Sequence, residues 1–176
     1  MKDITKIPLG TSLTGSFVCL YMKRLSTLLL LFMISSSASF AQTETPESEA
    51  VKKVITRLFD GMRKGDSLMV SQTFSKAMIM QPISDREGDM QVKTDKPSGF
   101  LKAVGTPHKD IWDERITFDQ VLIDANLASV WTSYQFFIGD KFSHCGVNSF
   151  QLVKGKEGWK IVYLIDTRRK ENCNQI

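Results

Sequence analysis

The hydrophobic periodicity of this chain changes once, near Trp112. Before that residue, apolar side chains recur every three to four positions, as they do on one face of a helix; after it they alternate with polar ones. Helices followed by consecutive strands predict an α+β domain in which N-terminal helices pack on a mainly antiparallel sheet. With 176 residues, 42% of them hydrophobic, the chain is long enough for one such domain with a core of its own.

The first helix is marked at both ends. Thr45 is a suitable N-cap and Pro46 occupies the first helical position, where a missing N–H costs nothing. Gly65 can adopt the left-handed conformation that ends a helix. An apolar stripe of helical period lies between them: Val51, Val54, Ile55, Leu58, Phe59 and Met62. The pattern therefore predicts a helix over 46–64, and Asp66 caps a shorter one that runs to about Phe74.

The remaining elements follow from turn residues and alternation. We expect a short strand at 77–80 that Pro82 ends, a polar hairpin within 84–98, and a short helix at 98–104. Four strands of a meander are then predicted, separated by turn-forming residues: 114–123, 127–138, 142–154 and 159–169.

The N-terminal region has the pattern of a secretory signal. Residues 22–42 read MKRLSTLLLLFMISSSASFAQ, with a basic start, an apolar run and a small-residue cleavage site. As a membrane anchor this segment is short and serine-rich. We expect 1–21 to be an upstream extension from a misplaced start, 22–41 a signal peptide and 42–176 a single domain. The mature protein is then exported, to a periplasmic or extracellular location.

The net charge of +4 comes mostly from this leader. Four of the 23 Lys and Arg residues lie before residue 42 with one of the 19 acids, so 42–176 carry 19 bases against 18 acids. This balance argues against a nucleic-acid partner, and against binding to an anionic membrane after signal removal.

Cysteine and histidine are scarce in the mature region. Cys145 and Cys173 either form one disulfide, which export would favour, or remain two separate thiols. His108 and His144 are the only histidines, and no Cys or His pair has metal-ligand spacing. We therefore expect no metal site and no cofactor.

Three segments carry a family resemblance: residues 128–134 (ASVWTSY), 142–152 (FSHCGVNSFQL) and 159–169 (WKIVYLIDTRR). Together with the order of elements, they resemble the nuclear transport factor 2-like superfamily, which includes ketosteroid isomerase, scytalone dehydratase and SnoaL-like cyclases. Within it they are similar to small exported bacterial proteins, some of them labelled lumazine-binding. The resemblance implies a cone-shaped domain with helices in the concave face of a strongly curved sheet, often dimeric. It implies no single activity, and no catalytic residue of ketosteroid isomerase can be matched here.

Strand alternation predicts which side chains meet. If Gly139-Asp140 is a two-residue turn, Gln135 lies opposite His144 and Trp131 opposite Asn148. A one-residue slip would exchange the two faces of the sheet. The more aromatic face is assigned to the core, and it supplies the predicted ligand-binding residues: Trp131, Gln135, His144, Asn148 and Tyr163. The opposite face supplies the predicted homodimer contacts: Tyr134, Val147, Leu164, Asp166 and Arg168.

These residues predict an exported protein that binds a small apolar or heteroaromatic ligand in a pocket of the concave sheet face. His144 is either a core-edge histidine bonded to Gln135 or an acid–base group, so an isomerase or dehydratase that uses His144 is one alternative. A non-catalytic dimeric interaction module is the other. Because neighbours on a strand point to opposite faces, His144 and Cys145 do not form a catalytic pair. No catalytic residue is assigned.

Overall fold

The computed structural model of the chain describes residues 44–86, 88–174 and 176. The predicted upstream extension and signal peptide lie outside this range. The described part forms one compact unit, Glu44–Ile176. Its helices are α2 (Pro46–Lys64), α3 (Ser67–Ser71) and α4 (Pro97–Gly105). Its strands are β1 (Phe74–Arg86), β2 (Asp89–Val92), β3 (Trp112–Asp124), β4 (Leu127–Ile138), β5 (Lys141–Gly155) and β6 (Gly158–Asp166).

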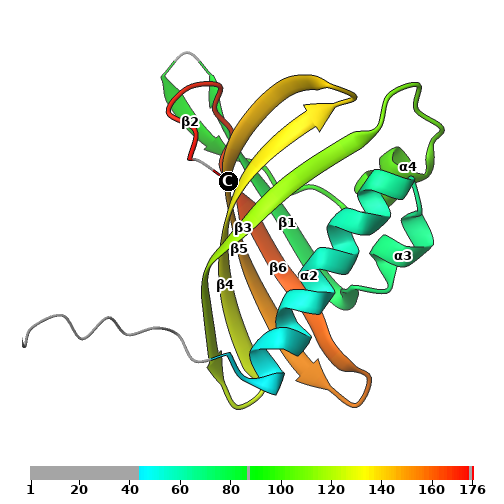
Figure 1. The fold of residues 1–176 in the computed structure, drawn as a ribbon, viewed down its shortest axis with the longest axis vertical. Helices are drawn as coiled ribbons and strands as arrows, with labels where there is room; N and C mark the ends of the chain where they lie inside the picture. Colours follow the sequence, from blue (N-terminus) through cyan, green and yellow to red (C-terminus); the bar gives the residue numbers. More distant parts are fainter. Residues whose placement is uncertain (1–43, 87, 175) are drawn as a thin grey trace, which may run out of the picture. The chain divides into compact units, whose positions relative to one another are not determined.

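The six strands form one mixed sheet in the order β2-β1-β6-β5-β4-β3. Strands β3 to β6 are an antiparallel meander, and β1 joins β6 in parallel. Figure 1 shows that the sheet is curved and that α2, α3 and α4 lie on the same side of it. The predicted α+β class, with N-terminal helices packed on a curved and mainly antiparallel sheet, is confirmed.

Helix α2 begins and ends where the sequence predicts. The Thr45 side chain accepts a hydrogen bond from Ser48 N, and the Ser48 side chain accepts one from Thr45 N, which makes a capping box. Gly65 ends the helix with φ 66°, and its N–H donates to backbone oxygens of the last turn. The apolar stripe of α2 then faces the sheet, where Phe59 packs edge-on against Phe150 of β5 at 6.2 Å between ring centroids.

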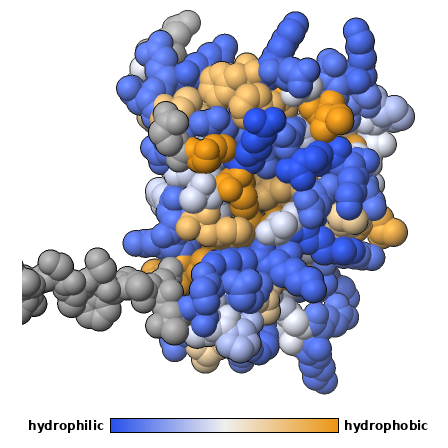
Figure 2. All heavy atoms as spheres, in the orientation of Figure 1, coloured by the Kyte–Doolittle hydropathy of each residue, from blue (hydrophilic) through white to orange (hydrophobic). Residues whose placement is uncertain are grey.

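The core lies between α2 and the middle of the meander. It contains Val51, Ile55 and Leu58 of the helix, and Val130, Phe150, Leu152 and Ile161 of the strands, all essentially without solvent exposure. Burial of each such side chain stabilises the fold by about 1.5–3 kcal/mol. On the face seen in Figure 2, hydrophobic side chains reach the surface as separate patches among hydrophilic ones. No helix in the described ranges is both long and apolar enough to span a bilayer.

The predicted register of β4 against β5 is wrong by one residue. Phe137 pairs with Phe142, but Phe136 pairs with His144, so Ser143 is an extra residue in β5. Such a bulge shifts every later pair by one position, which moves alternate side chains to the other face. Trp131 is therefore opposite Ser149 rather than Asn148.

A second bulge occurs between β5 and β6. Leu152 pairs with Ile161, as predicted, but Gln151 pairs with Tyr163, so Val162 is the extra residue. From there on the predicted β6 face is reversed: Asn148 lies opposite Asp166 rather than Ile165. Together the two bulges bring Tyr134, Leu164 and Asp166 to the helix-covered face.

The C-terminal segment crosses the other face of the sheet. Cys145 of β5 forms a disulfide with Cys173, which resolves the alternative that the sequence left open. Gln135 donates to the backbone oxygen of Asn174 at 3.0 Å, and the Asn174 side chain donates to Ser133 Oγ at 2.7 Å. These contacts hold the tail against β4 and β5.

Candidate functional site

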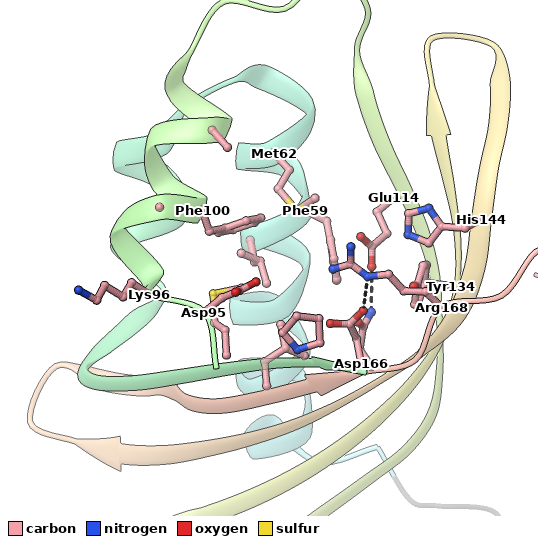
Figure 3. Close-up of a pocket in the computed structure, with 17 residues that line it drawn as sticks. Phe59, Met62, Asp95, Lys96, Phe100, Glu114, Tyr134, His144, Asp166 and Arg168 are labelled. Atoms are coloured by element: carbon pink, nitrogen blue, oxygen red, sulfur yellow. Dashed lines mark hydrogen bonds and ion pairs between the residues drawn. The ribbon is translucent and has the colours of Figure 1, made fainter. Parts of the chain in front are cut away.

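A cavity of about 440 Å³ lies between the helices and the sheet. One wall comes from α2 and α4 and is mainly apolar, with Phe59, Met62 and Phe100 pointing into the cavity (Figure 3). Asp95 and Lys96, just before α4, are the charged residues on this side. The opposite wall comes from the strands and is polar at one end. The polar end contains Glu114 of β3, Tyr134 of β4, His144 and Asn148 of β5, Asp166 of β6, and Arg168 just beyond β6.

Glu114 is the most perturbed acid of this polar end. It lies on β3 at an otherwise apolar alternate position, after Trp112 and before Ile116. Burial raises its pKa from 4.5 to about 7; a hydrogen bond from Asn148 acts in the opposite direction, and the nearby Asp166 carboxylate adds to the rise. Near neutral pH, Glu114 therefore exists both as a neutral acid and as a carboxylate.

Asn148 fixes the position of the Glu114 carboxyl. Its side chain is buried, and Nδ2 donates to Glu114 Oε1 at 2.9 Å and to Thr132 Oγ1 at 3.4 Å. Both amide hydrogens of Asn148 are thus used. Glu114 Oε1 is occupied, and no other group in the described part of the chain is recorded as bonding Oε2.

Asp166 and Arg168 form an ion pair at the same end of the cavity, drawn with dashed lines in Figure 3. Arg168 Nε donates to Asp166 Oδ2 at 2.8 Å. Burial raises the pKa of Asp166, and the hydrogen bond from Arg168 partly offsets that rise. The side chain of Arg168 stays 54% exposed, so its remaining donors are accessible from the cavity.

Two aromatic rings complete the polar end. His144 Nδ1 lies 3.0 Å from Ser143 Oγ, and its ring packs against Tyr134 and Phe136. Burial lowers the pKa of His144, and Arg168 and Lys170 lower it further, so the imidazole is mostly neutral at pH 7. The Tyr134 hydroxyl donates to the backbone oxygen of Thr167 at 2.8 Å, and burial raises its pKa.

Comparison of this architecture with known proteins shows what the chain is similar to. No family model matches the sequence, and no curated protein does. Solved structures do match. A nuclear transport factor 2-like (NTF2-like) protein of unknown function from Shewanella baltica OS155 is 16% identical with a TM-score of 0.56, over 73% of this chain and 100% of that one. The chain has the nuclear transport factor 2-like fold.

Two further structures share this nuclear transport factor 2-like fold. An NTF2-like protein with a cystatin-like fold from Novosphingobium aromaticivorans is 11% identical with a TM-score of 0.59, over 86% of this chain and 92% of that one. A domain of unknown function with a cystatin-like fold from Nostoc punctiforme PCC 73102 is 20% identical with a TM-score of 0.57, over 74% of this chain and 82% of that one. At these identities the likeness concerns the fold alone; lumazine binding stays a prediction.

The fold places two of the five predicted ligand-binding residues, His144 and Asn148, in the cavity lining. The other three lie on the outer face, because the bulges reverse β4 and the end of β6. Trp131 is 48% exposed there, and Gln135 contacts the C-terminal tail. Tyr163 donates to Gln81 Oε1 at 2.6 Å. A contact between His144 and Gln135 is also ruled out, since they project from opposite faces.

The predicted set of homodimer contacts is wrong for the same reason, because the two bulges turn most of these side chains to the helix-covered face. Four of its five residues line the cavity instead: Tyr134, Leu164, Asp166 and Arg168. Among the described residues, no group of three or more His, Cys, Asp or Glu side chains is placed to hold a metal ion.

Sequence reasoning missed Glu114 altogether. A signal for it was present, since Trp112, Ile116 and Phe118 alternate as an apolar face and Glu114 interrupts that face with an ionisable group. A charged residue at a core position of a strand is either paired or functional.

Proposed function

We propose that this nuclear transport factor 2-like domain binds a small molecule in the cavity between α2, α4 and the sheet. The observation that carries the proposal is an apolar-walled cavity with unused hydrogen-bonding groups at one end. Asp166 occupies only the Nε of Arg168, and no described residue is recorded as bonding its Nη1 or Nη2. The cavity volume, about 440 Å³, lies in the range of about 300–1,000 Å³ that is usual for ligand sites.

The test is to fill the cavity and measure ligand retention. Ala103 of α4 lines the cavity, and Ala77 of β1 is an exposed alanine outside it. Wild-type protein purified from its native compartment should release a small molecule on denaturation, detectable by mass spectrometry. Ala103→Phe should lose most of that molecule, whereas Ala77→Phe should retain it. Equal retention in both variants would contradict the proposal.

A proton-transfer enzyme of isomerase or dehydratase type is the second candidate, and Glu114 favours it. A carboxyl whose pKa is about 7 can both take and return a proton near neutral pH, which the neutral His144 does less readily. The experiment that separates the candidates is incubation of the retained molecule with fresh protein. A binder returns it unchanged, and an enzyme converts it at a rate that Glu114→Gln abolishes.

We also propose that the protein is exported. The Cys145–Cys173 disulfide supports this, because disulfides persist mainly in oxidising compartments. Mass spectrometry of the secreted or periplasmic form should find an N-terminus at Gln42. An N-terminus well before that residue would contradict the predicted signal peptide.

A further inference from the structure

We infer that the ligand of this cavity is an amphipathic monocarboxylate, whose carboxylate is bound between Arg168 and Glu114 and whose apolar body lies against α2 and α4. The inference rests on the proposed binding function. It adds the chemical class of the ligand and the two residues that select it.

Arg168 carries free hydrogen-bond donors at the polar end of the cavity. Its Nε donates to Asp166 Oδ2 at 2.8 Å, which anchors one side of the guanidinium and leaves Nη1 and Nη2 as a pair of free donors among the described residues. Figure 3 shows this guanidinium close to Asp166 and Glu114, at the polar end of the cavity. A planar fork of N–H groups matches the two oxygens of a carboxylate, which accepts both hydrogen bonds at once.

The charged side chains around Glu114 come in pairs of opposite sign. Asp166 and Arg168 face it from the end of β6 and carry opposite charges, and so do Asp95 and Lys96, which line the cavity just before α4. Tyr134 and His144 face the cavity from β4 and β5 and are neutral at pH 7. Asn148 contributes an amide, and α2 contributes apolar side chains. Once Glu114 is protonated, these charges balance, and Arg168 is the cation with free donors at this end of the cavity.

A cationic ligand fits the polar end of the cavity less well than a carboxylate does. An ammonium ligand would lie beside the guanidinium and leave its donors unused, so like-charge repulsion disfavours it. A ligand carboxylate uses those donors, and it accepts a further hydrogen bond from the protonated carboxyl of Glu114. The opposite wall is apolar at Phe59, Met62 and Phe100 and can bury an alkyl or aryl body there; its charged residues, Asp95 and Lys96, lie at the start of α4.

Binding of a carboxylate is then linked to proton uptake. A second negative charge near Glu114 raises the pKa of that residue further, so the complex holds a proton that the free protein releases above about pH 7. Affinity for a carboxylate should fall as the pH rises through this range, by up to about 10-fold per pH unit. A neutral ligand of the same shape should show no such dependence.

Three matched probes test the inference: 4-phenylbutanoate, 4-phenylbutanamide and 4-phenylbutylamine, each titrated by calorimetry into the protein freed of bound molecules. At about pH 6, the carboxylate should bind about 10-fold or more tightly than the amide, and the amine should bind least. Preference for the amide or the amine would overturn the carboxylate inference and leave the proposed binding function standing. No binding of any probe, with no molecule retained by the native protein, would overturn both.

Two variants assign the selectivity to residues. Arg168→Gln should weaken carboxylate binding about 10-fold more than amide binding, because only the charged ligand loses an ion pair. Arg169→Gln is the matched control, because the Arg169 side chain donates to Asn172 O and does not line the cavity. Equal losses in the two variants would overturn the role of Arg168.

Glu114→Gln tests the proton linkage. Glutamine keeps the acceptor that Asn148 needs and carries no titratable proton, so carboxylate affinity should become independent of pH between about pH 6 and pH 8. A pH dependence equal to that of the wild type would overturn the role of Glu114.

Discussion

Glu114 couples the stability of the protein to pH. Its pKa is about 7 in the folded protein and 4.5 ordinarily, so between these values the folded chain holds a proton that the unfolded chain has released. The free energy of unfolding therefore falls as the pH rises from about 4.5 to 7, by up to about 3 kcal/mol once Glu114 is ionised.

Glu114→Gln removes the loss of unfolding free energy that ionisation of Glu114 causes. The variant should be more stable than the wild type at about pH 8, and the two should be nearly equal at about pH 5, by urea denaturation. Glu157→Gln, on a side chain that is 86% exposed, is the control and should show little change at either pH. A variant less stable than wild type at about pH 8 would mean that ionised Glu114 is stabilised by its neighbours.

Gly146 is required by the close approach of the chain after β6. A Cβ atom at this position would lie 1.8 Å from the backbone oxygen of Thr167 and 2.7 Å from the Tyr134 ring. Gly146→Ala should therefore destabilise the protein by about 3 kcal/mol or more, because backbone has to move. Gly155→Ala, in the same strand with nothing within 4 Å, should change stability by less than about 1 kcal/mol. Similar thermal unfolding of the two variants would show that Thr167 moves freely.

At the scale of elements, the C-terminal tail is held to the sheet by one covalent bond. The Cys145–Cys173 disulfide joins residues 28 apart in sequence, and closing a loop of that length stabilises a protein by about 3–4 kcal/mol. Cys173→Ser should lose about this amount in oxidising denaturation experiments. Reductant should lower the stability of the wild type to that of the variant and leave the variant unchanged. A wild type insensitive to reductant would contradict this prediction.

Element boundaries were mostly predictable because they depend on local chemistry. The capping box at Thr45, the left-handed Gly65 and the turn at Gly139-Asp140 each act within a few residues. The strand after α3 is the main exception. It runs from Phe74 to Arg86 rather than over 77–80, because parallel pairing with β6 and the hairpin with β2 extend it through Pro82.

At the scale of the whole molecule, the homodimer stays a prediction, and the cavity residues no longer supply its surface. The outer sheet face offers Trp131, which is 48% exposed. Light scattering should show a dimer at micromolar concentration, and Trp131→Lys should shift it towards monomer. Leu68→Lys is the control: this side chain of α3 is 67% exposed, and its replacement should leave the dimer unchanged. A wild-type monomer would rule the dimer out.

The sequence by itself determined the α+β class, the order of helices and strands and most of their ends, because periodicity, caps and turns are local properties of the chain. It also placed His144 and Asn148 on the face that lines the cavity. Only the tertiary structure decided which faces of β4 and of the end of β6 join them. The reason is geometric: alternation has a period of two, so the single extra residues Ser143 and Val162 each reverse a face without changing the hydrophobic pattern that predicts the strand. The raised pKa of Glu114 also depends on the tertiary structure, because it comes from burial and from neighbours on other strands, which are far from Glu114 in the sequence.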